Sequence, residues 1–391
     1  MDQSFTIVPG PQLHFGLGKI SILPSTIKNY GSRIFLVTGA RSFTASPFFD
    51  QMVHQFSSTG LTFKHYAVDG EPTPAIVDTG VRLALDLNSE VVVAIGGGSA
   101  LDAGKAISAM IPLNEPVKGY LEGIGSKNAH TGSKIPFVAV PTTAGTGSEA
   151  AKNAVLSETG PKGYKRSLRH NNFVPNVAIL DPTLTLTCPA GTTASSGMDA
   201  FTQLLESYLS PAGNPITDAM ALEGLRIISK SLLSAYRDGS DITARAGMSL
   251  AAYLSGVTLT NAGLGLVHGF ASAIGGFFPV AHGIICSTLM PSVNRVTVKK
   301  LRSANSPGVL KKYAIVGRIF SSAAVEKSDS YYTDSLLEII ESWKVGMNIP
   351  GLLQIGITSA DFDKIIEVTE NKNNPISLTS DEMREALETA R

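Results

Sequence analysis

A glycine-rich segment, GGGSALDAGK at residues 96–105, directly follows the apolar run 91–95 of this 391-residue chain. Glycine lets a backbone turn approach a phosphate closely, and the start of a helix offers free N–H groups and the positive end of its dipole. Lys105 could donate to phosphate or ribose oxygens, and Asp102 could accept from hydroxyl groups. The segment matches neither a Walker A motif nor GxGxxG. It predicts a pyrophosphate site, and the alternative is a tight turn without a ligand.

A second polar segment, PTTAGTGSE at residues 141–149, also follows an apolar run. Its hydroxyl groups and glycines suit hydrogen bonding to a nucleotide, whereas the alternative is a polar turn that caps the next helix. We expect the segment at the carboxyl end of a second strand of the same sheet, which favours the nucleotide.

Candidate metal ligands occur in the second half of the chain. Asp199 and Gln203 are four residues apart, so they share one face of a helix. His268 and His282 lie in the stretch 246–294, which contains no Asp, Glu, Lys or Arg. A carboxylate and two imidazoles are good ligands for a divalent transition metal, and an amide oxygen is a weak fourth. A lone histidine is more often a hydrogen-bonded core residue, so only the combination indicates a metal site.

The elements that position these segments follow from the apolar pattern. Strand-length apolar runs occupy residues 33–38, 90–95, 135–140 and 176–180, and helical patterns occupy residues near 74–87 and at 216–237, 335–344 and 380–390. Alternating strands and helices are typical of a parallel sheet covered on both faces. From residue 193 onward the apolar spacing is helical. We expect an α/β nucleotide-binding domain with a parallel sheet at 1–185 and an all-helical domain at 186–391.

Composition and charge indicate a folded protein with a small-molecule ligand. The 32 Lys and Arg residues balance 32 Asp and Glu residues, so we expect neither nucleic acid nor a membrane as partner. Cys188 and Cys286 cannot build a disulfide framework, and the first ten residues lack a signal-peptide pattern, which predicts a cytoplasmic protein. The stretch 246–294 is long enough to cross a bilayer, but its Asn, His, Pro and Gly residues favour a buried helical core with a polar site.

These motifs, in this order, resemble the iron-containing (group III) alcohol dehydrogenase family over essentially the whole chain. The resemblance also includes residues 13–18, LDPTLT at 180–185, GMDAFTQLLESY at 197–208, both histidine segments and the Asn374-Pro375 pair. It implies a dehydroquinate synthase-like fold, with a metal in the cleft between the two domains. It also implies hydride transfer between a nicotinamide and an alcohol carbon. Residues 13–18 would form an opening β-hairpin.

The resemblance implies roles for individual residues. The pyrophosphate and its surroundings would be held by Gly97, Gly98, Ser99 and Asp102, and the rest of the nucleotide by Thr142, Thr143, Thr146 and Lys165. The four metal-ligand positions would be Asp199, Gln203, His268 and His282, with the two histidines at the reacting centre. A metal there would polarise the substrate oxygen as a Lewis acid, so no side-chain base is required.

Two positions depart from the usual family pattern. Many relatives have His where Gln203 stands, and a second His near the substrate where Ser272 stands. An amide oxygen should bind Fe²⁺ or Zn²⁺ less tightly than an imidazole, which leaves the identity and occupancy of the metal open. We expect binding through Asp199, His268 and His282, with Gln203 as a weak fourth ligand. The proton would reach solvent through water, the cofactor ribose or Ser272.

The end of the first long apolar run bears on the choice of cofactor. NAD-preferring relatives often carry Asp where Gly39 stands, and that carboxylate accepts from the ribose 2′-OH and repels a 2′-phosphate. Because this repulsion is absent and Arg41 and Ser42 follow closely, we predict a preference for NADP(H) over NAD(H). The alternative is a solvated loop arginine.

The leading hypothesis is a metal-assisted, NAD(P)-dependent alcohol dehydrogenase or carbonyl reductase that forms a homodimer or larger homo-oligomer. The main alternative is a metal-independent reductase of the maleylacetate reductase type. A dehydroquinate-synthase-like lyase would need Lys and Arg for its anionic substrate, and the stretch 246–294 supplies none. A nucleotide-binding protein without turnover is a further alternative. Phe270, Phe277 and Phe278 are candidate pocket walls, and plain helix packing is equally expected of them.

Overall fold

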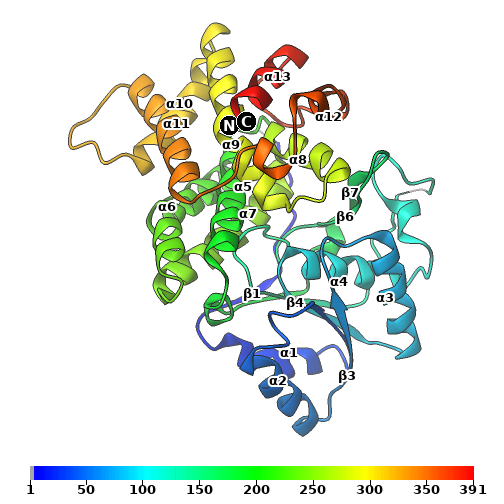
Figure 1. Cartoon of the computed structure of the whole chain (residues 1–391). Helices are drawn as coiled ribbons and strands as arrows, with labels where there is room; N and C mark the ends of the chain where they lie inside the picture. Colours follow the sequence, from blue (N-terminus) through cyan, green and yellow to red (C-terminus); the bar gives the residue numbers. More distant parts are fainter. Residues whose placement is uncertain (1–3, 128) are drawn as a thin grey trace.

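The computed structural model describes residues 4–127 and 129–391. Residues 1–3 and residue 128 lie outside the described residues. The first three belong to the segment expected to lack a signal peptide, and residue 128 belongs to the polar loop predicted at 125–133. The first half of the chain is an α/β unit and the second half is helical (Figure 1). The fold class predicted from the sequence is therefore confirmed.

The strands and helices of the two halves have the following bounds. The strands are β1 (Gln12–Phe15), β2 (Arg33–Gly39), β3 (Thr62–Val68), β4 (Val91–Gly96), β5 (Phe137–Pro141), β6 (Asn153–Glu158), β7 (Tyr164–Arg169) and β8 (Val177–Leu180). The helices of the first half are α1 (Leu23–Lys28), α2 (Pro47–Ser58), α3 (Pro74–Asp86) and α4 (Gly98–Met110). Those of the second half are α5 (Ala190–Leu209), α6 (Pro215–Arg237), α7 (Ile242–Ala262), α8 (Leu266–Phe277), α9 (His282–Ser303), α10 (Pro307–Phe320), α11 (Asp329–Gly346), α12 (Phe362–Val368) and α13 (Ser380–Thr389). Short 3₁₀ helices lie at Lys19–Ile22, Val117–Tyr120, Asn171–Phe173, Pro182–Thr185, Leu353–Ile355 and Ser359–Asp361.

Six parallel strands form the sheet in the order β1-β8-β5-β4-β2-β3. Helices α3 and α4 cover one face, and α1 and α2 cover the other (Figure 1). Along β4, Val92 and Ala94 pack with α3 and α4, whereas Val91 and Val93 pack on the opposite face. A strand buried on both faces must be apolar at successive positions, which is why β2, β4, β5 and β8 were predictable from the sequence.

Three strands were not predicted. The edge strand β3 alternates between exposed and half-buried residues, so it lacks a continuous apolar run. Strands β6 and β7 form a separate antiparallel hairpin. Residues 13–18 were expected to form a hairpin and instead contribute to β1, which pairs in parallel with β8. The hairpin expectation is wrong because the chain turns at Gly16 (φ 141°) and Gly18 (φ 71°) into a 3₁₀ helix rather than into a returning strand.

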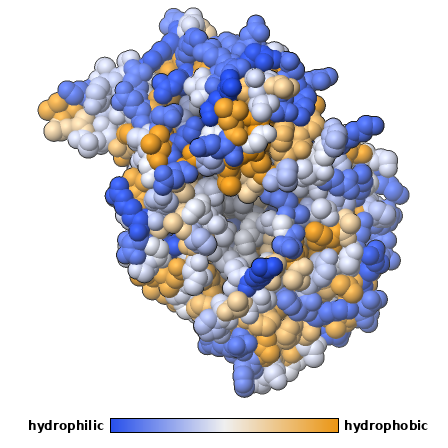
Figure 2. Space-filling view, in the orientation of Figure 1, coloured by the Kyte–Doolittle hydropathy of each residue, from blue (hydrophilic) through white to orange (hydrophobic). Residues whose placement is uncertain are grey.

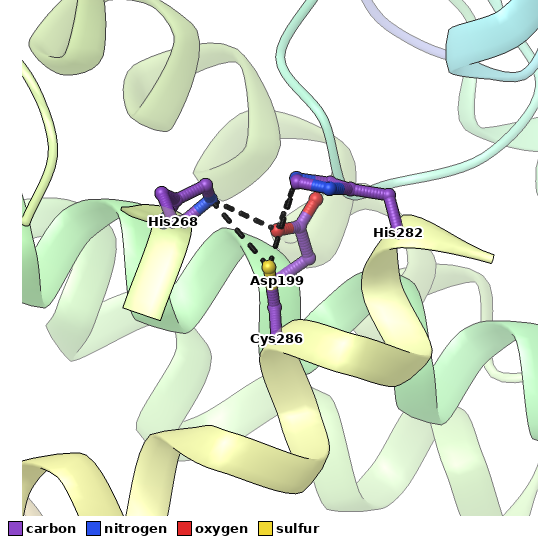
Figure 3. A group of neighbouring side chains, drawn as sticks. All are labelled: Asp199, His268, His282 and Cys286. Carbon is purple, nitrogen blue, oxygen red and sulfur yellow. Dashed lines mark hydrogen bonds and ion pairs between the residues drawn. The ribbon is translucent and has the colours of Figure 1, made fainter. Parts of the chain in front are cut away.

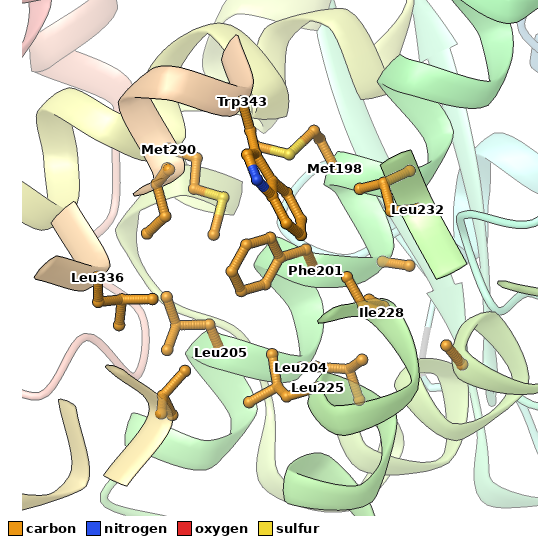
Figure 4. Close-up of a cluster of buried hydrophobic side chains, with 14 of the residues drawn as sticks. Met198, Phe201, Leu204, Leu205, Leu225, Ile228, Leu232, Met290, Leu336 and Trp343 are labelled. Carbon is orange, nitrogen blue, oxygen red and sulfur yellow. The ribbon is translucent and has the colours of Figure 1, made fainter. Parts of the chain in front are cut away.

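Helix α5 lies among the other helices of the second half, and its packing fixes the position of Asp199 and Gln203, which line the cleft toward the first half. Figure 4 shows Phe201 of α5 beside Trp343 of α11, with ring centroids 5.7 Å apart, among Met198, Leu205 and other apolar side chains. The helices predicted at 216–237, 335–344 and 380–390 are found as α6, α11 and α13. Helix α10 begins at Pro307, so the loop expected at 305–308 is shorter than predicted.

The charge-free stretch 246–294 forms most of α7, all of α8 and the first part of α9. Most of its side chains are buried, as expected for a helical core. In the described part of the chain, no single helix has the length and apolar character needed to cross a membrane. One pair, α7 and α8, meets that test on length and composition alone, with a bend of 97° between its helices.

Candidate functional site

A cleft of about 1000 Å³ lies between the two halves, and Figure 2 shows the recess on the face presented in Figure 1. The carboxyl ends of β2 and β4, the start of α4, the β6–β7 hairpin and helices of the second half all contribute to its lining. From β2 the chain continues to β3 on one side, and β4 lies on the other side. The cleft therefore opens at the switch point of the sheet, where open α/β sheets bind nucleotides.

The start of α4 faces this cleft. Within the described chain, no side chain caps the first N–H groups of this 13-residue helix, and Gly97, Gly98 and Ser99 line the cleft. A Cβ atom on Gly98 would lie 2.5 Å from Thr146 Cγ2, and one on Gly97 would lie 3.4 Å from Thr143 Oγ1. The two polar motifs thus pack against each other. Free N–H groups at a helix start with no Cβ in the way suit a pyrophosphate.

Asp102 and Lys105 hold the two motifs together. Asp102 Oδ1 accepts from Ser148 Oγ at 2.5 Å, and its Oδ2 accepts from the Val155 N–H at 3.0 Å. Lys105 is buried and donates to the Ser148 carbonyl at 2.7 Å and to the Asn153 carbonyl at 2.8 Å. Burial lowers the pKa of Lys105 to about 8. Asp102 lines the cleft, whereas Lys105 does not, because its Nζ points to the Ser148 and Asn153 carbonyls.

Most of the residues predicted to bind the nucleotide share the cleft. Those that line it are Gly39, Gly97, Gly98, Ser99, Asp102, Thr143, Thr146 and Lys165. Ser42 lies on the exposed loop after β2, and Thr142 donates its N–H to the Gly96 carbonyl at 2.9 Å; neither belongs to the lining. Lys165 on β7 is buried, and its Nζ donates to Glu71 Oε2 at 2.8 Å. Eight of the residues predicted to bind the nucleotide therefore share one cleft, and their role in binding it stays a prediction.

Three of the predicted metal ligands converge on the helical side of the cleft. Asp199 of α5, His268 of α8 and His282 of α9 meet there, and Cys286 of α9 joins them (Figure 3). Asp199 Oδ1 lies 3.3 Å from His268 Nε2 and 3.7 Å from His282 Nε2. Cys286 Sγ lies 3.7 Å from His268 Nε2 and 3.6 Å from His282 Nε2. The four donor atoms all lie within 4.8 Å of one another.

This donor set fits a divalent metal. Asp199 is 1% exposed, and its Oδ1 accepts no hydrogen bond from the described residues. Burying this carboxylate costs free energy, and a cation held between its Oδ1 and the two imidazole nitrogens would offset that cost. The His268 Nδ1 atom lies 2.6 Å from Glu206 Oε2, so its Nε2 faces the other donors. Carboxylates commonly orient metal-binding imidazoles in this way.

Burial and charge act in opposite directions on the two histidines. Burial alone would lower the pKa of His268, but Cys286, Glu206 and Asp199 outweigh it and raise the pKa well above its usual value. Burial lowers the pKa of His282 to about 4, although Asp199 opposes the shift. Burial also raises the pKa of the Cys286 thiol to about 11. His282 is therefore neutral near pH 7, which is the form that binds metals.

Gln203 contacts Asp199 through its amide. Its Nε2 donates to Asp199 Oδ2 at 3.1 Å, and its Oε1 accepts from Ser255 Oγ at 2.7 Å. Gln203 also lines the cleft and is 2% exposed. Both ends of the amide thus face polar atoms of the protein, and Ser255 Oγ also lies 2.7 Å from the Ala252 carbonyl, which competes for its one proton.

Ser272 lies one turn after His268 and lines the cleft. Its hydroxyl donates to the His268 carbonyl at 2.8 Å and accepts from Lys372 Nζ at 3.1 Å. Lys372 also donates to the His268 carbonyl at 3.0 Å. The serine therefore lies beside the donor cluster and next to an ammonium group.

The site contains further side chains that were not predicted from the sequence. Glu71 and Lys372 line the cleft, whereas Glu206 and Cys286 lie behind the lining and contact the histidines. Cys286 and Glu206 carried a signal, because Cys286 is one helical turn after His282 and Glu206 is two turns after Asp199. Glu71 and Lys372 lie outside regular helices and strands, far along the chain from their partners, and only the fold brings them in.

Two expectations about the cleft are wrong. Phe270 is fully buried in the core, and Phe277 and Phe278 pack against the same core, so none of the three lines the described cleft. The cleft is also not poor in basic groups, because the lining includes Lys152, Lys165, Arg166, Arg169 and Lys372. These five residues come from outside the stretch 246–294. The lack of charged residues in that stretch therefore does not exclude an anionic ligand in the cleft.

A glycine-rich turn lies at the switch point of the sheet and faces a buried Asp–His–His cluster across one cleft. This arrangement is typical of oxidoreductases that bind a dinucleotide and a divalent metal. The comparisons identify the family. Residues 10–182 match the family described as Iron-containing alcohol dehydrogenase, and residues 193–391 match the C-terminal part of the Fe-containing alcohol dehydrogenase family. The chain belongs to this family and is an oxidoreductase acting on CH–OH groups. The family implies a divalent metal and NAD(H).

Several relatives match over nearly their full length. Alcohol dehydrogenase 4 of Saccharomyces cerevisiae (strain YJM789) is 33% identical over 379 residues, which cover 95% of both chains. A 1,3-propanediol dehydrogenase of Klebsiella pneumoniae is 31% identical over 371 residues, which cover 93% of this chain and 92% of the relative. A crystal structure of a 1,3-propanediol oxidoreductase has a TM-score of 0.88 at 27% identity and covers 100% of both chains.

Proposed function

We propose that the protein catalyses metal-assisted hydride transfer between NAD(P) and a small alcohol or carbonyl compound. The observation that carries this proposal is the position of the uncapped start of α4 and the Asp199–His268–His282 cluster on one cleft. Relatives named for alcohol, 1,3-propanediol and 4-hydroxybutyrate oxidation support a small alcohol as substrate.

The chain's own residues bind and orient the reactants. Gly97, Gly98 and Ser99 would hold the pyrophosphate at the start of α4, because they line the cleft where the first N–H groups of that helix have no side-chain cap. Asp199 and the two histidines would hold the metal. When bound, the metal supplies Lewis-acid polarisation of the substrate oxygen, and the nicotinamide supplies the hydride acceptor or donor. Glu206 keeps the Nδ1 proton of His268 away from the cluster.

The proton of the substrate hydroxyl needs a route to solvent. We propose that it leaves through the Ser272 hydroxyl, which passes its own proton on to solvent, while the Lys372 ammonium 3.1 Å away stabilises the serine oxygen and takes up no proton. Ser272→Ala should then lower kcat and alter its pH profile. An unchanged rate and pH profile would remove the serine from the mechanism.

NADP(H) is the proposed preferred cofactor. Gly39 lines the cleft, and a Cβ atom there would meet nothing within 4 Å, so space for a 2′-phosphate lies beside the end of β2. Arg41 is exposed two residues later. Asp69, which follows β3 and also lines the cleft, is a carboxylate that opposes a 2′-phosphate. A kcat/KM higher with NADH than with NADPH would defeat the proposal.

The assembly and location are part of the same proposal. We expect a cytoplasmic homodimer or larger homo-oligomer, with the two domains divided between residues 185 and 186. The outer edge of β1 supports self-association, because an edge strand offers unpaired backbone groups. Both cysteines are free, in keeping with a reducing compartment. Light scattering on the purified protein tests the oligomer.

An assay of nicotinamide reduction and oxidation tests the proposed activity. Short-chain alcohols, diols, hydroxy acids and the matching carbonyl compounds are offered with NADP(H) and then NAD(H). We expect turnover with at least one primary alcohol or aldehyde. Cofactor binding without turnover of any compound would favour a nucleotide-binding protein and contradict the proposal.

A further inference from the structure

We propose that Cys286, rather than Gln203, is the fourth protein ligand of the metal, and that the centre prefers Zn²⁺ to harder divalent ions. This inference rests on the proposed metal-assisted function. It concerns which residues bind the metal, so it can fail while the function stands.

The distances around Cys286 fit one metal ion. Zinc binds sulfur at about 2.3 Å and nitrogen or carboxylate oxygen at about 2.0–2.2 Å, so a tetrahedral site has S–N edges of about 3.6 Å and O–N edges of about 3.3–3.5 Å. Cys286 Sγ lies 3.7 Å from His268 Nε2 and 3.6 Å from His282 Nε2. Asp199 Oδ1 lies 3.3 Å and 3.7 Å from the same two nitrogens. Three of these four edges lie within about 0.1 Å of the tetrahedral values, the Asp199–His282 edge is about 0.2 Å longer, and the remaining two edges are no longer than 4.8 Å, so small side-chain movements would close the site around a single ion.

The buried thiol is placed as a ligand rather than as core filling. Buried cysteines usually act as small apolar groups. Cys286 is fully buried and belongs to the hydrophobic core that α8 and α9 share, but its sulfur also lies between two imidazole nitrogens (Figure 3). It lies one turn after His282 on the same helix face, so a single helix would supply two adjacent ligands.

The amide of Gln203 turns its nitrogen, rather than its oxygen, toward Asp199. Asp199 Oδ2 can only accept, so the amide must present its NH₂ group to Asp199. The amide oxygen then faces Ser255 Oγ, at 2.7 Å. Gln203 therefore positions Asp199, and Cys286 takes the place among the ligands that the amide leaves free.

The chemistry of this set differs from that of an Asp–Gln–His–His set. Cys286 binds as the thiolate, so metal binding releases one thiol proton to solvent. With the Asp199 carboxylate, the thiolate neutralises the two positive charges of the metal, whereas an amide would leave one. Thiolate is a soft ligand that suits Zn²⁺ and Co²⁺ and disfavours Mg²⁺ and Mn²⁺.

Cobalt substitution of the full-length protein tests the inference directly. Thiolate bound to Co²⁺ gives a charge-transfer band in the near ultraviolet, which carboxylate, amide and imidazole ligands do not give. We expect one equivalent of Co²⁺ with this band in the wild-type protein, in Gln203→Ala and in Cys188→Ser, which removes the other cysteine. In Cys286→Ser we expect the band to be lost and the Zn²⁺ affinity to fall at least about 100-fold, because even partners behind the ligands change affinity by about 10–100-fold.

The outcomes separate the inference from the proposed function. One equivalent of Co²⁺ without the charge-transfer band in the wild-type protein would overturn the cysteine ligand and leave metal-assisted catalysis intact. Loss of Co²⁺ binding in Gln203→Ala with full binding in Cys286→Ser would also overturn it. Failure of the folded wild-type protein to bind any Co²⁺ or Zn²⁺ would overturn both. The wild-type spectrum needs no variant, so the test holds even if Cys286→Ser does not fold.

Discussion

Replacement of Glu206 by Gln should loosen the metal without unfolding the protein. Glu206 Oε1 accepts from the Val267 N–H at 2.7 Å, and its Oε2 lies 2.6 Å from His268 Nδ1. A glutamine of the same shape has one oxygen. If that oxygen keeps Val267, its NH₂ group faces Nδ1. The imidazole proton must then move to Nε2, the atom that faces the donor cluster.

The size of the effect follows from this change of tautomer. Partners that orient metal-bound histidines are worth about 10–100-fold in affinity, or about 1.4–2.7 kcal/mol. We therefore expect Glu206→Gln to raise the Kd for Zn²⁺ by that factor. Stability should also fall, by about 1.5–3 kcal/mol, because a buried charge-assisted hydrogen bond is lost.

A competition titration with a chromophoric chelator measures the affinity, and urea unfolding of the metal-free protein measures the stability. Glu223→Gln is a matched control, because Glu223 is exposed on α6, outside the lining of the cleft, and forms an ion pair with the nearby Arg226. It should leave the Kd for Zn²⁺ unchanged. A folded Glu206→Gln protein that binds Zn²⁺ as tightly as the wild type would refute the role given to Glu206.

Three further predictions follow from the nucleotide end of the cleft and from one buried carboxyl. Gly98→Val places side-chain atoms against Thr146, whose Cγ2 lies 2.5 Å from the position of a Cβ atom on Gly98. The Kd for the dinucleotide should therefore rise at least about tenfold in a fluorescence titration, while Zn²⁺ binding is kept. Unchanged dinucleotide binding would contradict the site. Gly39→Asp should move the ratio of kcat/KM for NADPH over NADH at least about tenfold toward NADH, and a ratio that stays constant would count against the placement of the 2′-phosphate. Burial raises the pKa of Glu149 from 4.5 to about 7, so the folded state holds this proton more tightly and the free energy of unfolding falls as pH rises from about 4.5 to about 7. Between pH 5 and pH 8 the free energy of unfolding of the wild-type protein should fall by an amount on the order of 3 kcal/mol because of Glu149, and denaturation of Glu149→Gln should lack this fall. Equal pH dependence of the wild-type and Glu149→Gln proteins would disprove the prediction.

The parts of the fold that the sequence predicted are those in which burial leaves a local pattern. Strand β4 is apolar at every position because helices cover both of its faces, and the helices α6, α11 and α13 carry one apolar stripe each. Strands β3, β6 and β7 have partly exposed faces, so their pattern mixes polar and apolar residues. Their pairing depends on segments far along the chain, which no local pattern reports.

The site residues also differ in how far the sequence indicates them. Asp199, His268 and His282 could be predicted together because the resemblance to a family places all three at metal-ligand positions, whereas each residue alone is more often a part of the core. Cys286 and Glu206 lie on the same helices at helical spacing and could have been added. Lys372 reaches Ser272 across 100 residues of sequence through a contact that only the folded chain reveals.

The measurement that tests the central claim most directly is the activity of metal-stripped protein during stepwise return of Zn²⁺ or Fe²⁺, with bound metal measured at each step. The account predicts negligible hydride transfer in the stripped protein and a rise that tracks occupancy and ends at one equivalent. Full activity in protein with no bound metal would contradict metal-assisted catalysis and support the metal-independent reductase.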